Sequence, residues 1–317
     1  MGCHNPGHKA RGYRRDPVIP VCRTIQQTLR DAADHLERAG IDTARLDAEV
    51  LLRHVLDIDR TTLFLRYPDP MPGDAVAILA DLIERRLTGE PVAYLTGVRE
   101  FMALPFRVAP GVLIPRPDTE PLVEWALDWL HDRPDAVVAD IGTGSGAIAV
   151  AIAAHAPETF AGRVVAIDTS REALAIATAN ADALLPPARR ARIAFRLGSL
   201  TDPLDAPVDL LLANLPYLTP EQIARNPDLD AEPRLALDGG PDGLDLVRAV
   251  IADLPRVLAP DGAAGFELDP SQATAVQSQL ETTFPGAQVI IVHDLARLSR
   301  HVVLIRRKSA DNAPGSR

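Results

Sequence analysis

The chain has little sulfur chemistry and no long apolar run. Its two cysteines, Cys3 and Cys22, lack the spacing of a metal knuckle or a disulfide framework. We therefore expect no metal site and a reducing, cytoplasmic compartment. No apolar stretch reaches the roughly 20 residues that a membrane span requires, so we expect no membrane partner.

Aromatic residues and positive charge are also scarce. Aromatics make up 4% of the 317 residues, and the formal net charge is -10. A protein that binds long nucleic acids by neutralising phosphates needs a basic domain, which is absent here, so we expect no direct nucleic-acid partner. Apolar residues at 47% and charged residues at 24% indicate a folded chain, whose core must be built from Leu, Val, Ile and Ala.

Hydrophobic periodicity divides the chain into five segments. Apolar residues at helical spacing predict a small helical domain, and a stretch rich in β-branched and turn-forming residues predicts short linking strands after it. The segments are a disordered tail at 1–23, the helical domain at 24–92, the linker at 93–118, a second domain at 119–308 and a disordered tail at 309–317.

The second domain alternates strands with helices. Strands are expected at 136–140, 163–168, 192–197 and 208–214, with helices between most of them. Strands joined by crossover helices predict an α/β fold, a doubly wound and mostly parallel sheet. Two further apolar runs near the C-terminus, VIIV and HVVLI, indicate a closing pair of strands.

A glycine-rich loop follows the first of these strands. The segment DIGTGSG runs from Asp140 to Gly146, and Asp168 ends the next strand. Such a loop lets the backbone approach a nucleotide, and a carboxylate at that second position can accept hydrogen bonds from ribose hydroxyls. The loop also fits a relaxed dinucleotide fingerprint, so by itself it leaves NAD and S-adenosylmethionine both open. Asp140 favours the methyl donor.

The strand at 208–214 delivers Asn214-Leu215-Pro216-Tyr217 to the same sheet edge. An amide or aromatic amine nitrogen is a poor nucleophile that carries two N–H donors. The Asn214 side-chain oxygen and a backbone carbonyl at Leu215 can accept both, which orients the nitrogen and stabilises its growing positive charge. Tyr217 can stack on a planar amide or base; alternatively it packs against the sheet.

Four segments in order carry a family resemblance. GEPVAYLTGVREFMALPFRVAPGVLIPRPDTEPLVE, DIGTGSGAIAVAIA, the Asn-x-Pro-Tyr tetrapeptide and EPRLALDGGPDGL together resemble the HemK/PrmC family of release factor glutamine methyltransferases, over about residues 24–306. IPRPDTE and EPRLALDGG are the most specific parts.

The resemblance implies a class I methyltransferase domain, a helical domain that docks the release factor, and a β-hairpin between them. It places the donor, S-adenosyl-L-methionine, on Asp140, Gly142, Thr143, Gly144, Ser145, Gly146, Asp168, Leu200 and Asn214. It places catalysis on Asn214, Pro216 and Tyr217, and substrate binding on these residues and Leu215. The chain departs from the family pattern at Leu215, where Pro is usual, at Leu200, where an aromatic is usual, and at FELDPSQ, where Glu-Ile-Gly is usual.

These observations predict a cytoplasmic, monomeric enzyme that methylates the glutamine of the Gly-Gly-Gln loop in class I peptide chain release factors. S-Adenosyl-L-homocysteine would be the other product. Asn-Leu-Pro-Tyr also occurs in ribosomal RNA adenine dimethyltransferases, so an adenine methyltransferase acting on RNA or DNA is an alternative. A non-catalytic nucleotide-binding module is a further one.

Overall fold

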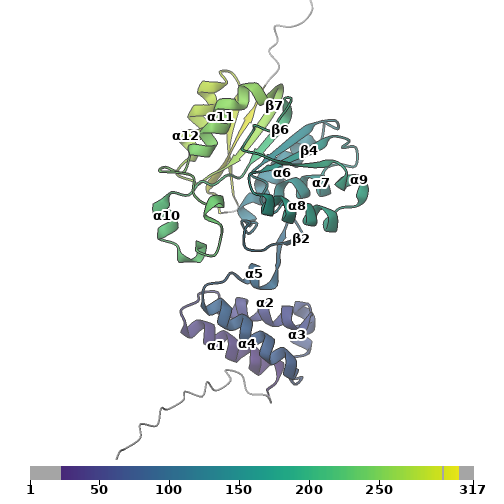
Figure 1. The fold of residues 1–317 in the computed structure, drawn as a ribbon, viewed down its shortest axis with the longest axis vertical. Helices are drawn as coiled ribbons and strands as arrows, with labels where there is room; N and C mark the ends of the chain where they lie inside the picture. The colour runs from purple at the N-terminus through teal and green to yellow at the C-terminus, as the bar shows by residue number, and fades with distance from the viewer. Residues whose placement is uncertain (1–22, 295, 307–317) are drawn as a thin grey trace, which may run out of the picture. The chain divides into compact units, whose positions relative to one another are not determined.

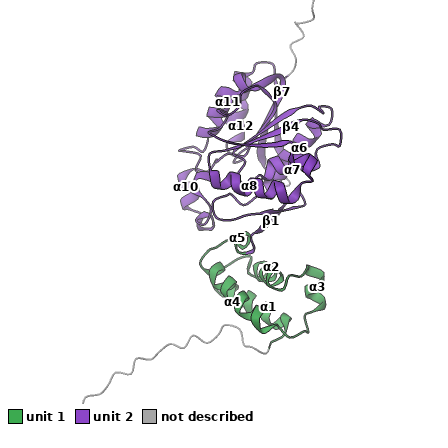
Figure 2. Cartoon of the chain, turned by 45° about the vertical axis from the view of Figure 1, so that its right-hand side comes forward, with its two compact units in different colours: residues 1–95 green, residues 96–317 purple. Residues whose placement is uncertain are grey.

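The computed structural model describes residues 23–294 and 296–306, and Figure 1 labels many of their helices and strands. The chain forms two compact units that meet in sequence between Leu95 and Thr96 (Figure 2). The tails predicted at 1–23 and 309–317 lie outside the described residues, except for Arg23, as do both cysteines.

The first unit is helical, as the apolar stripes predict. Its helices are α1 (Ile25–Arg38), α2 (Ala44–Leu56), α3 (Arg60–Leu65), α4 (Gly73–Leu87) and α5 (Val92–Thr96), the last of which crosses the boundary. Thr24 begins α1 with a capping box, in which its side chain accepts from Gln27 N and the Gln27 side chain accepts from Thr24 N. Apolar residues at helical spacing on α1, α2 and α4 are buried in one core: Leu29, Ala32, Leu36, Ala48, Leu51, Leu52, Leu79, Leu82 and Ile83.

A β-hairpin opens the second unit. Strands β1 (Val98–Phe101) and β2 (Leu104–Arg107) pair antiparallel through a turn at Met102 and Ala103. Both turn residues have positive φ, at 49° and 57°, which is unusual outside glycine. The turn is anchored because Met102 N donates to Glu120 Oε1 at 2.8 Å. Phe101 and Phe106 are buried in the core of the second unit, so the predicted linking strands are part of that unit's packing.

The second unit is built on a seven-stranded sheet (Figure 1). Its order is β5-β4-β3-β6-β7-β9-β8, and all neighbours are parallel except β9, which is antiparallel to both β7 and β8. This confirms the predicted doubly wound α/β fold with a closing antiparallel strand. The strands are β3 (Val137–Ile141), β4 (Arg163–Asp168), β5 (Ile193–Leu197), β6 (Val208–Ala213), β7 (Leu258–Glu267), β8 (Gln288–His293) and β9 (Ser299–Ile305).

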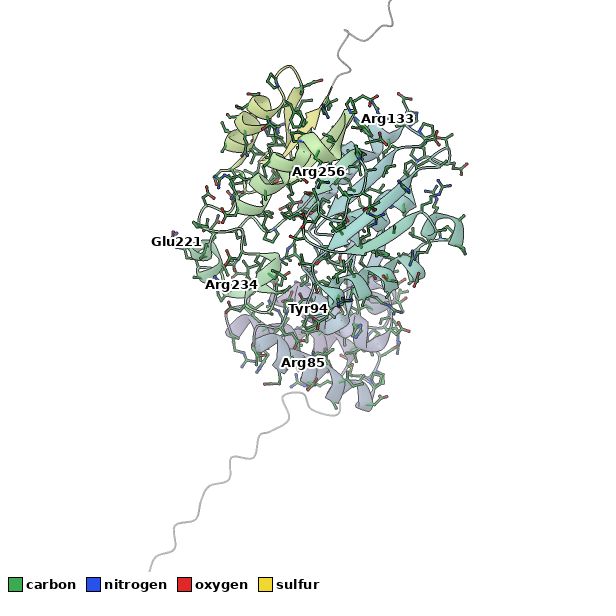
Figure 3. All side chains as sticks on the ribbon, turned by 45° about the horizontal axis from the view of Figure 1, so that its top comes forward. Arg85, Tyr94, Arg133, Glu221, Arg234 and Arg256 are labelled. Atoms are coloured by element: carbon green, nitrogen blue, oxygen red, sulfur yellow. The ribbon has the colours of Figure 1, made fainter. Side chains whose placement is uncertain are left out.

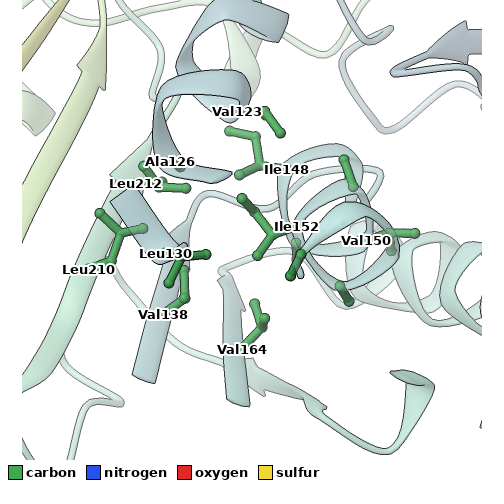
Figure 4. Close-up of a cluster of buried hydrophobic side chains, with 14 of the residues drawn as sticks. Val123, Ala126, Leu130, Val138, Ile148, Val150, Ile152, Val164, Leu210 and Leu212 are labelled. Carbon is green, nitrogen blue, oxygen red and sulfur yellow. The ribbon is translucent and has the colours of Figure 1, made fainter. Parts of the chain in front are cut away.

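Helices cover both faces of this sheet because successive strand residues point to opposite sides. Val138 packs in one apolar cluster with α6 (Glu120–Leu130) and α7 (Ala147–His155), which Figure 4 shows. Ala139, the next residue, packs in the other cluster with α11 (Asp245–Val257) and α12 (Ala273–Thr283). The remaining elements are α8 (Arg171–Leu184), α9 (Pro187–Arg190), α10 (Pro220–Ala224) and the 3₁₀ turns η1 (Pro117–Thr119), η2 (Pro227–Leu229) and η3 (Arg234–Ala236).

The strand order reverses between β3 and β6, from which the chain continues to opposite edges of the sheet. In open α/β sheets, ligands bind at the carboxyl ends of the strands at such a switch point. The glycine loop follows β3, Asp168 ends β4 and Asn214 follows β6, so the fold brings these sequence-distant residues to one edge.

Candidate functional site

A cavity of ≈ 470 Å³ lies at this switch point, which is within the range of small-molecule sites. Its walls come from the loops after β3, β4, β5 and β6, from the segment that precedes α6, and from η3. Nine of the residues that the sequence proposes line it: Gly142, Thr143, Gly144, Ser145, Asp168, Leu200, Asn214, Leu215 and Pro216. Asp140, Gly146 and Tyr217 are not among its lining residues.

The glycine loop is held against the end of β4. The backbone N–H groups of Gly142 and Thr143 both donate to Ile167 O at 2.9 Å. Gly142 has φ 74° and Gly146 has φ 83°, which glycine adopts without strain. A Cβ on Gly146 would lie 3.0 Å from the Cβ of Ala177 on α8. Gly146 therefore serves close helix packing, whereas Gly142 faces the cavity.

Asp140 is buried behind the glycine loop and is hydrogen-bonded to it. It is 1% exposed, and its Oδ2 accepts from Thr143 Oγ1 at 2.6 Å and from Ala149 N at 3.0 Å. Burial raises the pKa of this carboxyl to about 7, although both hydrogen bonds act in the opposite direction. Its Oδ1 is buried without a hydrogen-bond partner. This geometry gives Asp140 a structural role beneath the loop.

Asp168 faces the cavity with hydrogen-bonding capacity to spare. Its Oδ2 accepts from Gly144 N at 2.9 Å and its Oδ1 accepts from Ser170 N at 2.8 Å. Each oxygen of an ionised carboxylate has about two acceptor positions, so each retains one for a ligand. Two adjacent ligand hydroxyls, such as those of a ribose, match this arrangement.

Leu200 lines the same cavity in a backbone conformation that is unusual for leucine. It has φ 45°, in the left-handed region, and its side chain lines the cavity and packs against the core. The following residue is anchored, because Thr201 Oγ1 donates to Asp253 Oδ2 at 2.6 Å and Arg256 Nη2 donates to Thr201 O at 3.3 Å. Arg256 is labelled in Figure 3. An aliphatic side chain thus occupies the place where the resemblance puts an aromatic beside adenine.

The Asn-Leu-Pro-Tyr tetrapeptide contributes its first three residues to the cavity. Asn214 Nδ2 donates to the hydroxyl of Thr119 at 3.0 Å. Leu215 is 4% exposed, and a Cβ placed on Gly142 would lie 3.0 Å from its Cδ2. The Leu215 side chain therefore contacts the glycine loop, in addition to any part played by its backbone carbonyl.

Tyr217 is directed toward the sheet. Its hydroxyl donates to Oε1 of the fully buried Glu267 at 3.3 Å, and Glu267 Oε2 lies 3.8 Å from Nε2 of buried His301. Burial and the adjacent Glu267 charge raise the pKa of the Tyr217 phenol, which keeps it protonated. Of the two interpretations of Tyr217, stacking on substrate and packing against the sheet, this geometry matches the second.

Two buried side chains that connect segments around the cavity were not predicted from the sequence. The Glu232 carboxylate accepts from Ile114 N at 3.0 Å and pairs with Arg116, which joins IPRPDTE to EPRLALDGG at the cavity wall. The side chain of buried Asn180 accepts from Arg107 N at 2.8 Å and donates to Ser145 O at 2.8 Å, which joins the hairpin to the glycine loop. The presence of both motifs in the family resemblance was the signal for the first contact, although the motifs lie far apart in the sequence. A lone Asn on a helix gave no signal for the second.

The described ranges contain no cluster of three or more His, Cys, Asp or Glu side chains that could hold a metal ion. Within the same residues, no helix is both long and apolar enough to cross a membrane.

Comparisons with known proteins agree with this geometry. Residues 27–97 match the family described as the PrmC N-terminal domain, and residues 138–226 match a methyltransferase domain. The release factor glutamine methyltransferase of Moorella thermoacetica is 38% identical over 287 residues, covering 90% of this chain and 99% of the relative. The enzyme of the same name from Burkholderia pseudomallei is 40% identical over 282 residues, covering 87% and 96%.

Among solved structures, the hMettl16 catalytic domain in complex with MAT2A 3'UTR hairpin 6 has a TM-score of 0.53 at 15% identity, covering 69% of this chain and 81% of that one. That likeness shows the fold alone. The relatives' identity over nearly the whole chain shows more: the chain belongs to the release factor glutamine methyltransferase family.

Proposed function

We propose that this chain methylates the side-chain amide nitrogen of the glutamine in the Gly-Gly-Gln loop of class I peptide chain release factors, with S-adenosyl-L-methionine as donor. The observation that carries the proposal is Asn214, which lines the cavity at the end of β6 together with Gly142 and Asp168. An amide acceptor and a nucleotide-bound methyl group would meet there.

The residues present fit the donor. Asp168 retains one acceptor position on each oxygen for the ribose hydroxyls, and Gly142 and Gly144 give a ligand close access to the backbone. Leu200 and Leu246 supply apolar surface for the base. The donor supplies a methyl group on a charged sulfonium, so no base is needed to begin the transfer.

The chain contributes placement and electrostatics on the acceptor side. Asn214 Oδ1 and the Leu215 carbonyl would accept the two N–H groups of the glutamine amide, which aims the nitrogen lone pair along the line of transfer. Both acceptors also stabilise the positive charge that develops on the nitrogen. The proton leaves afterwards to solvent.

The first unit is proposed to dock the release factor. Its described residues expose large apolar side chains: Leu46 at 57%, Phe64 at 48%, Leu65 at 76% and Ile78 at 53%. A contiguous exposed apolar patch favours contact with another protein, and we propose that these side chains belong to one. Such a substrate places the enzyme in the cytoplasm, and we propose that it acts there as a monomer without binding nucleic acid directly.

Transfer of labelled methyl groups from the donor tests this proposal. Intact release factor and an adenine-containing RNA are offered together, and the protein and RNA are then counted separately. We expect label on the release factor and none on the RNA. Label on RNA alone would contradict the proposal in favour of an adenine methyltransferase, and no label on either would favour the non-catalytic module.

A further inference from the structure

Thr119 carries a hydrogen bond that its place in the helix does not explain. It ends η1 and stands at the N-cap of α6, where threonine is favoured because its hydroxyl can accept from a free backbone N–H. No such capping bond is present at α6. The hydroxyl instead accepts from Asn214 Nδ2 at 3.0 Å, across 95 residues of sequence.

In this contact the Asn214 amide has one orientation, with the Thr119 hydroxyl as acceptor. A hydroxyl can also donate, so the N–H groups of the substrate amide, which require Oδ1, complete the selection. An asparagine amide has a donor end, Nδ2, and an acceptor end, Oδ1, which exchange places when the group rotates by half a turn. With Nδ2 directed at Thr119, Oδ1 lies at the opposite end of the amide and stays free for another donor. In the reversed orientation Nδ2, a hydrogen-bond donor, would face the glutamine nitrogen, whose N–H groups are also donors. No hydrogen bond would form between them, so that orientation would be unproductive.

The hydroxyl is well fixed for this task. Thr119 is 3% exposed and lines the cavity, and its backbone N donates to Arg116 O at 3.1 Å. The preceding residue, Asp118, pairs with Arg300 on β9 at 3.2 Å. The turn that carries the hydroxyl is thereby attached to the sheet on which Asn214 stands.

We infer that Thr119 is a positioning residue, which holds the Asn214 amide with Oδ1 toward the methyl acceptor. The inference rests on the proposed function of Asn214 and assigns a role to the threonine of IPRPDTE. Thr119 acts through Asn214 and takes no part in bond making.

Two substitutions separate this role from simple packing. Thr119→Val keeps the shape of the side chain but removes the hydroxyl, whereas Thr119→Ser keeps the hydroxyl and removes a methyl group. A single neutral hydrogen bond accounts for about tenfold in an equilibrium or rate, so kcat for release factor methylation should fall about tenfold in Thr119→Val. In Thr119→Ser, kcat should stay within about twofold of wild type. KM for the release factor and Kd for S-adenosyl-L-homocysteine should change by less than about twofold in both.

A double substitution tests whether Thr119 acts through Asn214. In the Asn214→Ala background, Thr119→Val should lower kcat no further, because the amide that it positions is gone. An equal additional loss in that background would overturn the inference, and so would wild-type kcat in a folded Thr119→Val protein or a Thr119→Ser protein as slow as Thr119→Val.

A measurement without substrate keeps this test separate from the proposed function. In protein labelled with ¹⁵N at asparagine, the Asn214 side-chain protons should exchange slowly with solvent in wild type and in Thr119→Ser, and at least about tenfold faster in Thr119→Val. Equal exchange in all three proteins would refute the Thr119 contact. Failure of wild-type protein to methylate the release factor would instead refute the proposed function.

Discussion

Removal of the Asp168 carboxylate should weaken donor binding by a predictable amount. Its two oxygens each accept one backbone N–H, from Gly144 and Ser170, and each keeps one free position toward the cavity. In Asp168→Ala, a ribose would lose charge-assisted hydrogen bonds that contribute about 1.5–3 kcal/mol each. The loss of even one corresponds to a Kd about 10- to 150-fold higher.

Isothermal titration with S-adenosyl-L-homocysteine measures this change directly. Asp205→Ala is the matched control, because its carboxylate is 83% exposed, lies outside the cavity lining and pairs with Arg196. We expect the control to bind as wild type does. Circular dichroism should show that Asp168→Ala remains folded, since the two orphaned N–H groups border the cavity and can be hydrated. A Kd within twofold of wild type in the folded variant would remove Asp168 from the donor site.

Three further predictions address the loop, the tetrapeptide and the first unit. The pKa of Asp140 is about 7 in the folded protein and ordinarily 3.8, so the folded state binds this proton more tightly than the unfolded state does. The contribution of Asp140 to the free energy of unfolding should therefore decline as pH rises from about 4 to 7. Urea unfolding at pH 5 and pH 7 should show wild type losing roughly 2 kcal/mol relative to Asp140→Asn, and parallel pH profiles of the two proteins would contradict this. Leu215→Pro should keep glutamine methylation because the backbone carbonyl remains. It should lower the free energy of unfolding by about 1–2 kcal/mol because the side-chain contact with Gly142 is lost. A folded variant without activity would show that the leucine side chain takes part in catalysis. A fragment beginning at Thr96, which keeps the hairpin and its buried Phe101, should bind S-adenosyl-L-homocysteine normally but methylate intact release factor at least about tenfold more slowly, and equal rates would refute the docking role.

Much of the second unit could be predicted because its signals are local. Buried parallel strands are continuous apolar runs, so β3, β4 and β6 stand out, and the turn chemistry of DIGTGSG marks the loop that follows β3. Helix α12 was not predicted, because ATAVQSQLETT carries only three buried residues, Ala273, Val276 and Leu280, on a mostly polar helix. Tertiary packing against the sheet stabilises it where its own pattern is weak.

Site residues could be predicted where a particular residue type at the end of a strand indicates a binding role. They were harder to predict where a side chain could point either into the cavity or into the protein interior. Asp168 and Asn214 line the cavity as proposed, whereas Asp140 lies beneath the loop and Tyr217 turns to Glu267. Alternation along a strand does not determine the direction of a side chain in the irregular segment that follows it. The contact between Thr119 and Asn214 depends on the whole sheet, so no local pattern reveals it.

The central claim, that the acceptor is the glutamine amide of the release factor, is tested most directly by locating the methyl group. Tandem mass spectrometry of release factor treated with wild-type enzyme should find one methyl on the glutamine side chain of the Gly-Gly-Gln loop. A release factor with asparagine in place of that glutamine should receive none, and Asn214→Ala should act about 10²–10³-fold more slowly. A methyl group on any other residue, or undiminished transfer to the asparagine-substituted factor, would contradict the account.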